Sequence, residues 1–187
     1  MSNVFVKQPT DPIRPGYTFH RMQTFSLEIA RRKLQKIRKG KKVVLAAGTF
    51  DVLHPGHLDY FEWAKRHGDV LVVCVVGDKR TRRRKGEGRP IVKEEWRALM
   101  VSSVKPVDVV FVSNSRPFEE EIIQAIQPDV VVTPGDEPSK EKKAAFAAYF
   151  RETFPAIELV MKNRTAFRRK SSTRSIIAKV KKLPSPV

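Results

Sequence analysis

The chain has 187 residues, with 37 Lys and Arg against 20 Asp and Glu, which gives a formal net charge of +17. This length fits one domain with an appendage and buries a full core without disulfides. The single cysteine, Cys74, excludes a disulfide framework and a cysteine-based zinc finger. No apolar run is long enough to span a membrane, and residues 1–15 lack a signal-type stretch, so a cytoplasmic protein is expected.

The basic residues gather in three clusters, at residues 31–42, 79–85 and 162–182, which together hold 23 of the 37. A charge of this size favours either a nucleic-acid binder or an enzyme with a polyanionic substrate. The chain lacks the interleaved aromatic residues and the recognised motifs of nucleic-acid binders, so that class is the weaker one. A basic run is also compatible with a merely solvated helix face.

Residues 1–25 are rich in proline and predict an irregular arm. Apolar residues then recur at spacings of three and four, which predicts an amphipathic helix ending near Gly40. We expect this helix to pack on the domain or on a second copy of the chain, with its basic face outward. The apolar stripe consists of Leu27, Ala30, Leu34 and Ile37.

From residue 42 onward, predicted strands and helices alternate. The strands are short and rich in valine, as in parallel sheets that are buried on both faces. We therefore expect an α/β protein with a Rossmann-like, doubly wound, five-stranded parallel sheet and an N-terminal helical extension. Its parts would be the arm and helix at 1–40, the domain at 41–183 and a tail at 184–187. The predicted strands are 43–47, 70–76, 108–112, 129–133 and 157–161, and the later helices are 57–66, 93–104, 118–126, 139–151 and 172–181.

The first predicted strand runs into the segment Gly-Thr-Phe-Asp-Val-Leu-His-Pro-Gly-His at residues 48–57. Ligands of doubly wound sheets bind at the carboxyl ends of the strands, and a helix N-terminus attracts phosphate. His54 and His57 lie three residues apart at such a helix start, so both imidazoles can face the same phosphates and donate hydrogen bonds to them. A zinc site is the weaker alternative, because it needs further ligands.

The pattern Gly48-Thr49-Phe50-Asp51-x-x-His54-x-Gly56-His57 resembles the signature of the cytidylyltransferase-like nucleotidyltransferases. The resemblance extends from about residue 43 to 180. It implies that His54 and His57 stabilise charge on the phosphates during displacement at the α-phosphorus. It also implies that the nucleotide is contacted around Gly48, Thr49, Phe50 and Gly56, with Asp51 shaping the turn rather than acting as a base.

The second predicted strand is followed at residues 77–91 by a basic segment, which we expect to be a loop that contacts the ligand. The stretch Arg-Lys-Gly-Glu-Gly-Arg-Pro-Ile at 84–91 resembles the heptose-1-phosphate adenylyltransferase branch of the family, and the glycerol-3-phosphate cytidylyltransferase branch has a similar, shorter loop. By this resemblance Lys85 contacts phosphate. Arg89 either contacts phosphate too or orders the loop.

Two later segments complete the expected site. Gly135 and Asp136 match a nucleotide-binding segment after the fourth strand, although Pro134 stands where the family commonly has lysine. Ser172 and Thr173 match hydroxyl residues that hold the β- and γ-phosphates at the start of the last helix; Arg174 replaces the next hydroxyl residue of the pattern, and Ser175 is expected to serve one position later. A plain helix cap is the alternative. The basic residues before that helix include Arg168 and Arg169, which are expected to face the same phosphates.

The leading hypothesis is an enzyme that transfers AMP from ATP, bound with Mg²⁺, to a sugar phosphate and releases pyrophosphate. The alternatives are CTP with glycerol 3-phosphate or another alcohol phosphate, and ATP with flavin mononucleotide. The resemblance also implies a homodimer as one option, because dimers are common in the family. No metal-binding side chains are expected.

Overall fold

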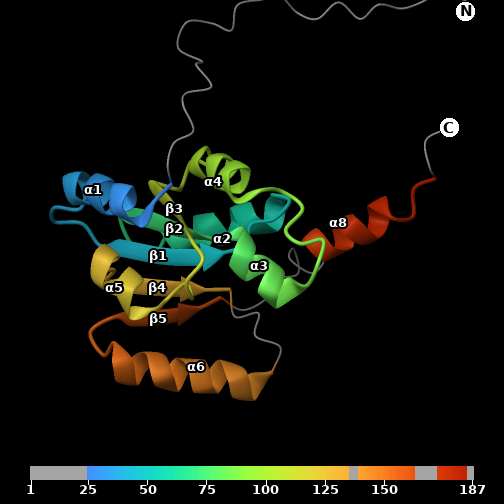
Figure 1. Cartoon of the computed structure of the whole chain (residues 1–187). Helices are drawn as coiled ribbons and strands as arrows, with labels where there is room; N and C mark the ends of the chain where they lie inside the picture. Colours follow the sequence, from blue (N-terminus) through green and yellow to red (C-terminus); the bar gives the residue numbers. More distant parts are fainter. Residues whose placement is uncertain (1–24, 135–138, 163–171, 185–187) are drawn as a thin grey trace, which may run out of the picture.

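The computed structural model of the chain describes residues 25–134, 139–162 and 172–184, and the structural statements that follow concern these ranges. Five parallel strands form one sheet in the order β3-β2-β1-β4-β5. This arrangement, with helices on both faces, confirms the predicted doubly wound α/β fold (Figure 1). The strands are β1 (Val43–Gly48), β2 (Val70–Val76), β3 (Val109–Ser113), β4 (Val130–Thr133) and β5 (Glu158–Met161).

Helices cover the sheet from two sides because each central strand buries both of its faces. Val43 and Leu45 of β1 belong to one apolar cluster, whereas Val44 and Ala46 belong to the other. The first cluster is covered by α1, α5 and Phe150 of α6, and the second by α2 and α4. The helices are α1 (Leu27–Ile37), α2 (Pro55–Lys65), α3 (Asp78–Lys85), α4 (Glu94–Ser102), α5 (Glu120–Ile126), α6 (Lys140–Thr153) and α8 (Thr173–Val180).

Helix α1, which carries much of the first basic cluster, packs on its own domain. Its apolar stripe buries Ala30 and Leu34 in the core between β3 and α5. The Arg38 guanidinium donates to two carbonyl oxygens at the C-terminal end of α5, those of Ile126 at 3.0 Å and Gln127 at 2.9 Å. A cation stabilises this end of a helix because its last carbonyls are unpaired and carry partial negative charge. Part of the charge on α1 therefore anchors the helix.

The expectation of a loop at residues 77–91 is wrong for its first half, which is the helix α3. Its sequence, Asp-Lys-Arg-Thr-Arg-Arg-Arg-Lys, has no apolar periodicity to predict a helix. The helix is held at its start instead: the Asp78 amide donates to Glu94 Oε2 at 2.5 Å, and the Asp78 carboxylate pairs with Arg97 at 2.6 Å. Thr81, within α3, is the residue of this helix that is buried against the domain. Tertiary contacts, not local preference, make this segment helical.

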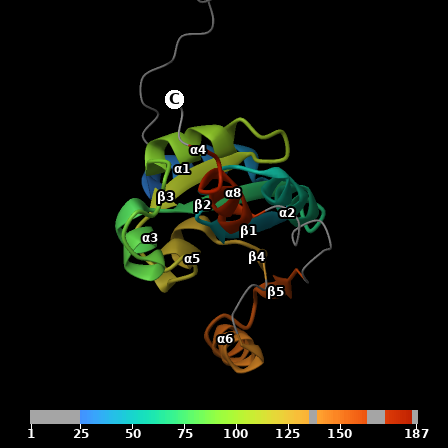
Figure 2. The same ribbon diagram turned by 90° about the vertical axis from the view of Figure 1, so that its right-hand side faces the viewer.

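The carboxyl ends of the strands point toward the side of the molecule on which α3 and α8 lie (Figures 1 and 2). Cys74 lies in the middle of β2, where burial raises the pKa of its thiol to about 12, so it is a core residue and not a nucleophile. None of the helices within the described ranges is long and apolar enough to cross a membrane.

Candidate functional site

A cavity of about 730 Å³ opens at the carboxyl ends of the strands, where the sequence places the ligand. Its walls come from the end of β1, from α3, from the segment between β3 and α5, and from α6. Thr173 of α8 also lines it. Among the described residues, five cationic side chains and two carboxylates, those of Asp51 and Glu119, line the cavity; the cations are Arg80, Arg84, Lys85, Arg116 and Lys143. An anionic ligand fits this surplus of positive charge.

His54 and His57 meet at the N-terminus of α2, as their spacing predicts. His54 is the helix cap: its Nδ1 accepts a hydrogen bond from the Gly56 amide at 3.1 Å. Accepting at Nδ1 leaves the proton of the neutral ring on Nε2, so Nε2 is the donor. The two rings stack with centroids 3.8 Å apart and planes at 23°, and His57 lines the cavity. The two imidazoles thus lie together at the start of α2, where Pro55 has no amide hydrogen and the amides of Gly56 and His57 already donate to His54.

The turn before these histidines has an unusual backbone. Phe50 and Val52 adopt positive φ angles of 50° and 54°, a region that is costly for a β-branched residue such as Val52. The Phe50 ring folds back over Gly48, where a Cβ atom would lie 2.7 Å from Phe50 Cζ, so glycine is required there. The Thr49 hydroxyl is buried without a hydrogen-bond partner among the described residues, and Thr49 lines the cavity. A bound ligand would supply that partner.

Asp51 connects three segments that are far apart in sequence. Its Oδ1 accepts from the amides of Ile91 and Val92 at 2.9 and 3.0 Å, and its Oδ2 accepts from Arg89 Nε at 2.7 Å. Its carbonyl oxygen accepts from the Thr173 hydroxyl at 2.6 Å. Burial alone would raise the pKa of Asp51, but these donors together lower it below its ordinary value. Asp51 therefore shapes the turn, and Arg89 orders the segment after α3.

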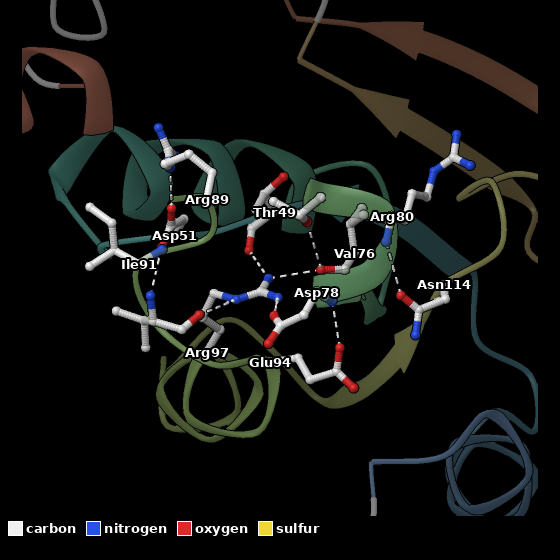
Figure 3. A network of polar contacts seen from close by, with 12 residues as sticks. Thr49, Asp51, Val76, Asp78, Arg80, Arg89, Ile91, Glu94, Arg97 and Asn114 are labelled. Carbon is white, nitrogen blue, oxygen red and sulfur yellow. Dashed lines mark hydrogen bonds and ion pairs between the residues drawn. The ribbon is translucent and has the colours of Figure 1, made fainter. Parts of the chain in front are cut away.

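Arg97 of α4 is a fully buried positive charge beneath this turn; it follows residues 84–91 in the pattern that resembles the heptose-1-phosphate adenylyltransferase branch, but the sequence gave it no role. Its guanidinium donates to the carbonyl oxygens of Thr49, Val76 and Val92 and pairs with Asp78 (Figure 3). The carbonyl groups of Thr49 and Val76 stand at the ends of β1 and β2. Arg97 thus ties together the backbone of the two strand ends from which the cavity is built.

Lys85 is the last residue of α3 and lines the cavity. The pKa of its ammonium is lowered to about 8, first because the cavity removes water around it and then because Arg89 and Arg84 are nearby. Such an environment disfavours an isolated positive charge and favours a bound anion. Lys85 therefore lies where the sequence predicted a phosphate contact, but it is carried by a helix rather than by a loop.

Helix α8 begins with the predicted hydroxyl residues. The hydroxyls of Ser172 and Ser175 form a capping box, in which each accepts from the other residue's amide, at 3.1 and 3.0 Å. Thr173 is the one of the three that lines the cavity, and its hydroxyl reaches Asp51. Four further residues proposed from the sequence, Gly135, Asp136, Arg168 and Arg169, lie outside the described residues.

A model of the cytidylyltransferase-like family matches residues 45–182, which include the β1–α2 turn, the Arg97 network and α8. The chain belongs to the cytidylyltransferase-like family. This confirms the resemblance inferred from the segment 48–57, and it places the two histidines, Lys85 and Thr173 inside the matched range.

Named relatives agree with this assignment. The chain is 41% identical over 131 residues to "Bifunctional protein HldE" of Wolinella succinogenes, covering 67% of this chain and 27% of that protein. It is 39% identical over 123 residues to the HldE protein of Helicobacter pylori strain P12, covering 64% and 26%. The chain thus spans about a quarter of the length of these curated relatives.

A solved structure also shares the fold. A lipopolysaccharide core biosynthesis protein from Thermoplasma volcanium superposes with a TM-score of 0.58 at 27% sequence identity. The match covers 67% of this chain and 99% of that one.

The described residues contain no group of three or more His, Cys, Asp or Glu side chains arranged to hold a metal. Of the two carboxylates in the cavity, Asp51 already accepts three hydrogen bonds. A magnesium ion that enters with a nucleoside triphosphate belongs to that substrate.

Several residues of the site were missed because their partners are distant in sequence. Arg116 after β3 and Lys143, Phe146 and Tyr149 of α6 line the cavity, although none lies in a motif. Lys162 at the end of β5 donates to the Asp59 carboxylate on α2 at 2.9 Å, which holds β5 against the histidine-bearing helix. Only the strand order and helix placement bring these groups to one edge of the sheet.

Proposed function

We propose that the chain is a nucleotidyltransferase that transfers AMP from MgATP to a sugar phosphate and releases pyrophosphate. The observation that carries this proposal is the stacked pair of His54 and His57 at the mouth of α2, beside a cationic cavity. The identity with the HldE relatives supports the adenylyltransferase branch that residues 84–91 resemble.

In the proposed reaction an oxygen of the acceptor phosphate attacks the α-phosphorus of ATP. A new phosphorus–oxygen bond forms, and the bond from the α-phosphorus to the bridging oxygen breaks. The electron pair leaves with pyrophosphate, and no proton has to move because the attacking group is already an anion. The residues act by positioning and by electrostatic stabilisation. His54 Nε2 and the imidazole of His57 donate to the phosphate oxygens on which charge develops.

The direct test is pyrophosphate release by the purified chain with ATP or CTP and a panel of acceptors: a hexose 1-phosphate, a heptose 1-phosphate, glycerol 3-phosphate and flavin mononucleotide. We expect release with ATP and a sugar 1-phosphate, and none without acceptor. Release confined to CTP with glycerol 3-phosphate would replace the proposed substrates. No release with any pair would contradict the proposal as a whole.

The pKa of Lys85 predicts a pH dependence of nucleotide binding. The ammonium is charged below about pH 8 and loses its charge above it. We expect the Kd of α,β-methylene-ATP, measured by calorimetry, to rise several-fold between about pH 7 and about pH 9.5. Lys85→Arg should bind tightly across this range, because a guanidinium stays charged.

Lys85→Gln provides the control. Any change in Kd that comes from titration of α,β-methylene-ATP itself affects this variant and the wild type equally. This variant should bind weakly at all pH values, with a shallower dependence on pH than the wild type. An equally steep dependence in Lys85→Gln would show that another group titrates.

A further inference from the structure

The cavity has a second cationic group on the opposite side of β1 from β4 and β5. Arg80 and Arg84 of α3 follow β2, and Arg116 follows β3. Because the strand order is β3-β2-β1-β4-β5, these three arginines lie on the β3 side of the histidine-bearing turn. Figure 2 looks onto this end of the sheet and shows α3 and α5 on one side of β1 and α2 on the other.

The three guanidinium groups line one part of the cavity, and of the three only Arg116 has an ion pair among the described residues, a long one with Glu119. Partial burial, followed by the charges of Arg116 and Arg84, lowers the pKa of Arg80. The nearest recorded acid is Glu119, whose Oε1 lies 3.9 Å from Arg116 Nε, beyond hydrogen-bond distance. Within the described ranges none of the three makes a hydrogen bond to a carboxylate. The other two arginines at this end of the sheet, Arg89 and Arg97, are each paired with an aspartate.

The backbone holds this group in a fixed arrangement. The Arg80 amide donates to Asn114 Oδ1 at 3.2 Å, which joins α3 to the segment that carries Arg116 (Figure 3). Gly77 permits this approach, since a Cβ atom there would lie 2.4 Å from Asn114 Oδ1. Two segments separated by more than thirty residues therefore present their arginines to the same part of the cavity.

The nucleotide phosphates have their own contacts elsewhere in the proposed site. In the proposed reaction these are His54 Nε2, His57, Lys85 and the start of α8. In a displacement at phosphorus the attacking and leaving oxygens lie roughly in line, so the acceptor enters from the side away from the departing pyrophosphate. In the proposed function the departing pyrophosphate is held at Thr173 on α8. We therefore assign the β3 side of the cavity to the acceptor. A single attacking phosphate bound near the histidines does not explain why three more cationic side chains, Arg80, Arg84 and Arg116, line this side of the cavity.

We propose that Arg80, Arg84 and Arg116 form a second anion subsite, so that the acceptor carries another phosphate or a carboxylate besides its attacking phosphate. This inference rests on the proposed function, because it defines the acceptor of that reaction. Guanidinium groups suit either anion, since both accept paired hydrogen bonds from the planar fork.

The test compares three acceptors that share one sugar: glucose 1-phosphate, glucose 1,6-bisphosphate and glucuronic acid 1-phosphate. Calorimetric titrations, made with α,β-methylene-ATP present, measure the Kd of each. We expect one of the two compounds that carry a second anionic group to bind about 10- to 100-fold more tightly than glucose 1-phosphate, which is the range for charged hydrogen bonds. Tighter binding of glucose 1,6-bisphosphate would identify the second anionic group as a phosphate, and tighter binding of glucuronic acid 1-phosphate would identify it as a carboxylate.

The double variant Arg80→Gln/Arg116→Gln should abolish this preference while leaving the Kd of α,β-methylene-ATP unchanged. Arg82→Gln is the matched control: it lies on the same helix, is exposed and does not line the cavity, so it should keep the preference. A weakened Kd for α,β-methylene-ATP in the double variant would assign the arginines to the triphosphate and overturn the proposal. Failure of both compounds with a second anionic group to bind more tightly than glucose 1-phosphate would also overturn it.

These titrations do not depend on turnover. Absence of pyrophosphate release with every acceptor would count against the proposed reaction, whereas the binding preference tests the subsite separately.

Discussion

Replacement of His57 by alanine is expected to lower kcat for pyrophosphate release by about 10²- to 10³-fold, the usual effect of removing one oxyanion donor. The imidazole lines the cavity at the start of α2, where charge on the phosphate oxygens increases during displacement. The Kd of α,β-methylene-ATP should change much less than kcat, because the donor acts mainly on the transition state. Initial rates under saturating substrates, together with calorimetry, separate the two quantities.

His67→Ala is the matched control, because His67 follows the C-terminal end of the same helix and packs on Trp63. It should retain the wild-type kcat. His54→Asn keeps an acceptor, Oδ1, for the Gly56 amide at the helix cap, so a comparable loss of kcat in that variant would come from the missing imidazole rather than from a disrupted turn. A His57→Ala enzyme with kcat within a factor of about three of the wild type would exclude the proposed role.

Arg97→Met is expected to lower the free energy of unfolding by about 3–5 kcal/mol, the usual cost of breaking a buried ion pair. The substitution leaves the carboxylate of Asp78 without its cation and the carbonyl groups of Thr49 and Val76 without their buried donor. For a chain of this size the loss corresponds to a fall in Tm on the order of 10 °C. Differential scanning calorimetry and urea titration measure it.

Arg82→Met on the exposed face of α3 is the control and should leave Tm nearly unchanged. Arg97→Lys restores the charge but not the planar fork, so it should recover only part of the loss. An Arg97→Met protein with wild-type Tm would mean that the buried guanidinium does not hold the strand ends together.

Most of the sheet and its helices follow from local patterns. The valine-rich segments are strands because they are buried on both faces. The helix predicted at 139–151 is α6, which Ser139 caps with its Oγ accepting from the Lys142 amide at 3.1 Å. The order of the strands does not follow from such patterns, because it depends on pairings such as that of Val44 with Val130, which are distant in sequence. Helix α3 was missed for a related reason, since its stability comes from Glu94 and Arg97.

The residues of the candidate site likewise fall into those that local sequence patterns predicted and those that depend on contacts distant in sequence. The histidine-bearing turn, Lys85 and the hydroxyl residues of α8 were selected because their chemistry and spacing are local. The function of Asp51 as a junction was only partly predictable: its place in the turn was expected, but its contacts with residues 91 and 92 cross about forty positions. Arg116 and Lys143 were not predictable, because a surface cation becomes a cavity residue only through the packing of its helix or loop.

Helix α8 differs from the other described helices in how it is attached. It contributes no fully buried side chain, and the hydrogen bond recorded between it and the rest of the described chain is the one from Thr173 to the carbonyl oxygen of Asp51. A segment held by so few contacts opens at a small fraction of the free energy needed to unfold the sheet. Part of the proposed phosphate-binding surface is therefore subject to local opening, and the affinity of a ligand that binds there includes the conformational entropy lost when the helix is held in place.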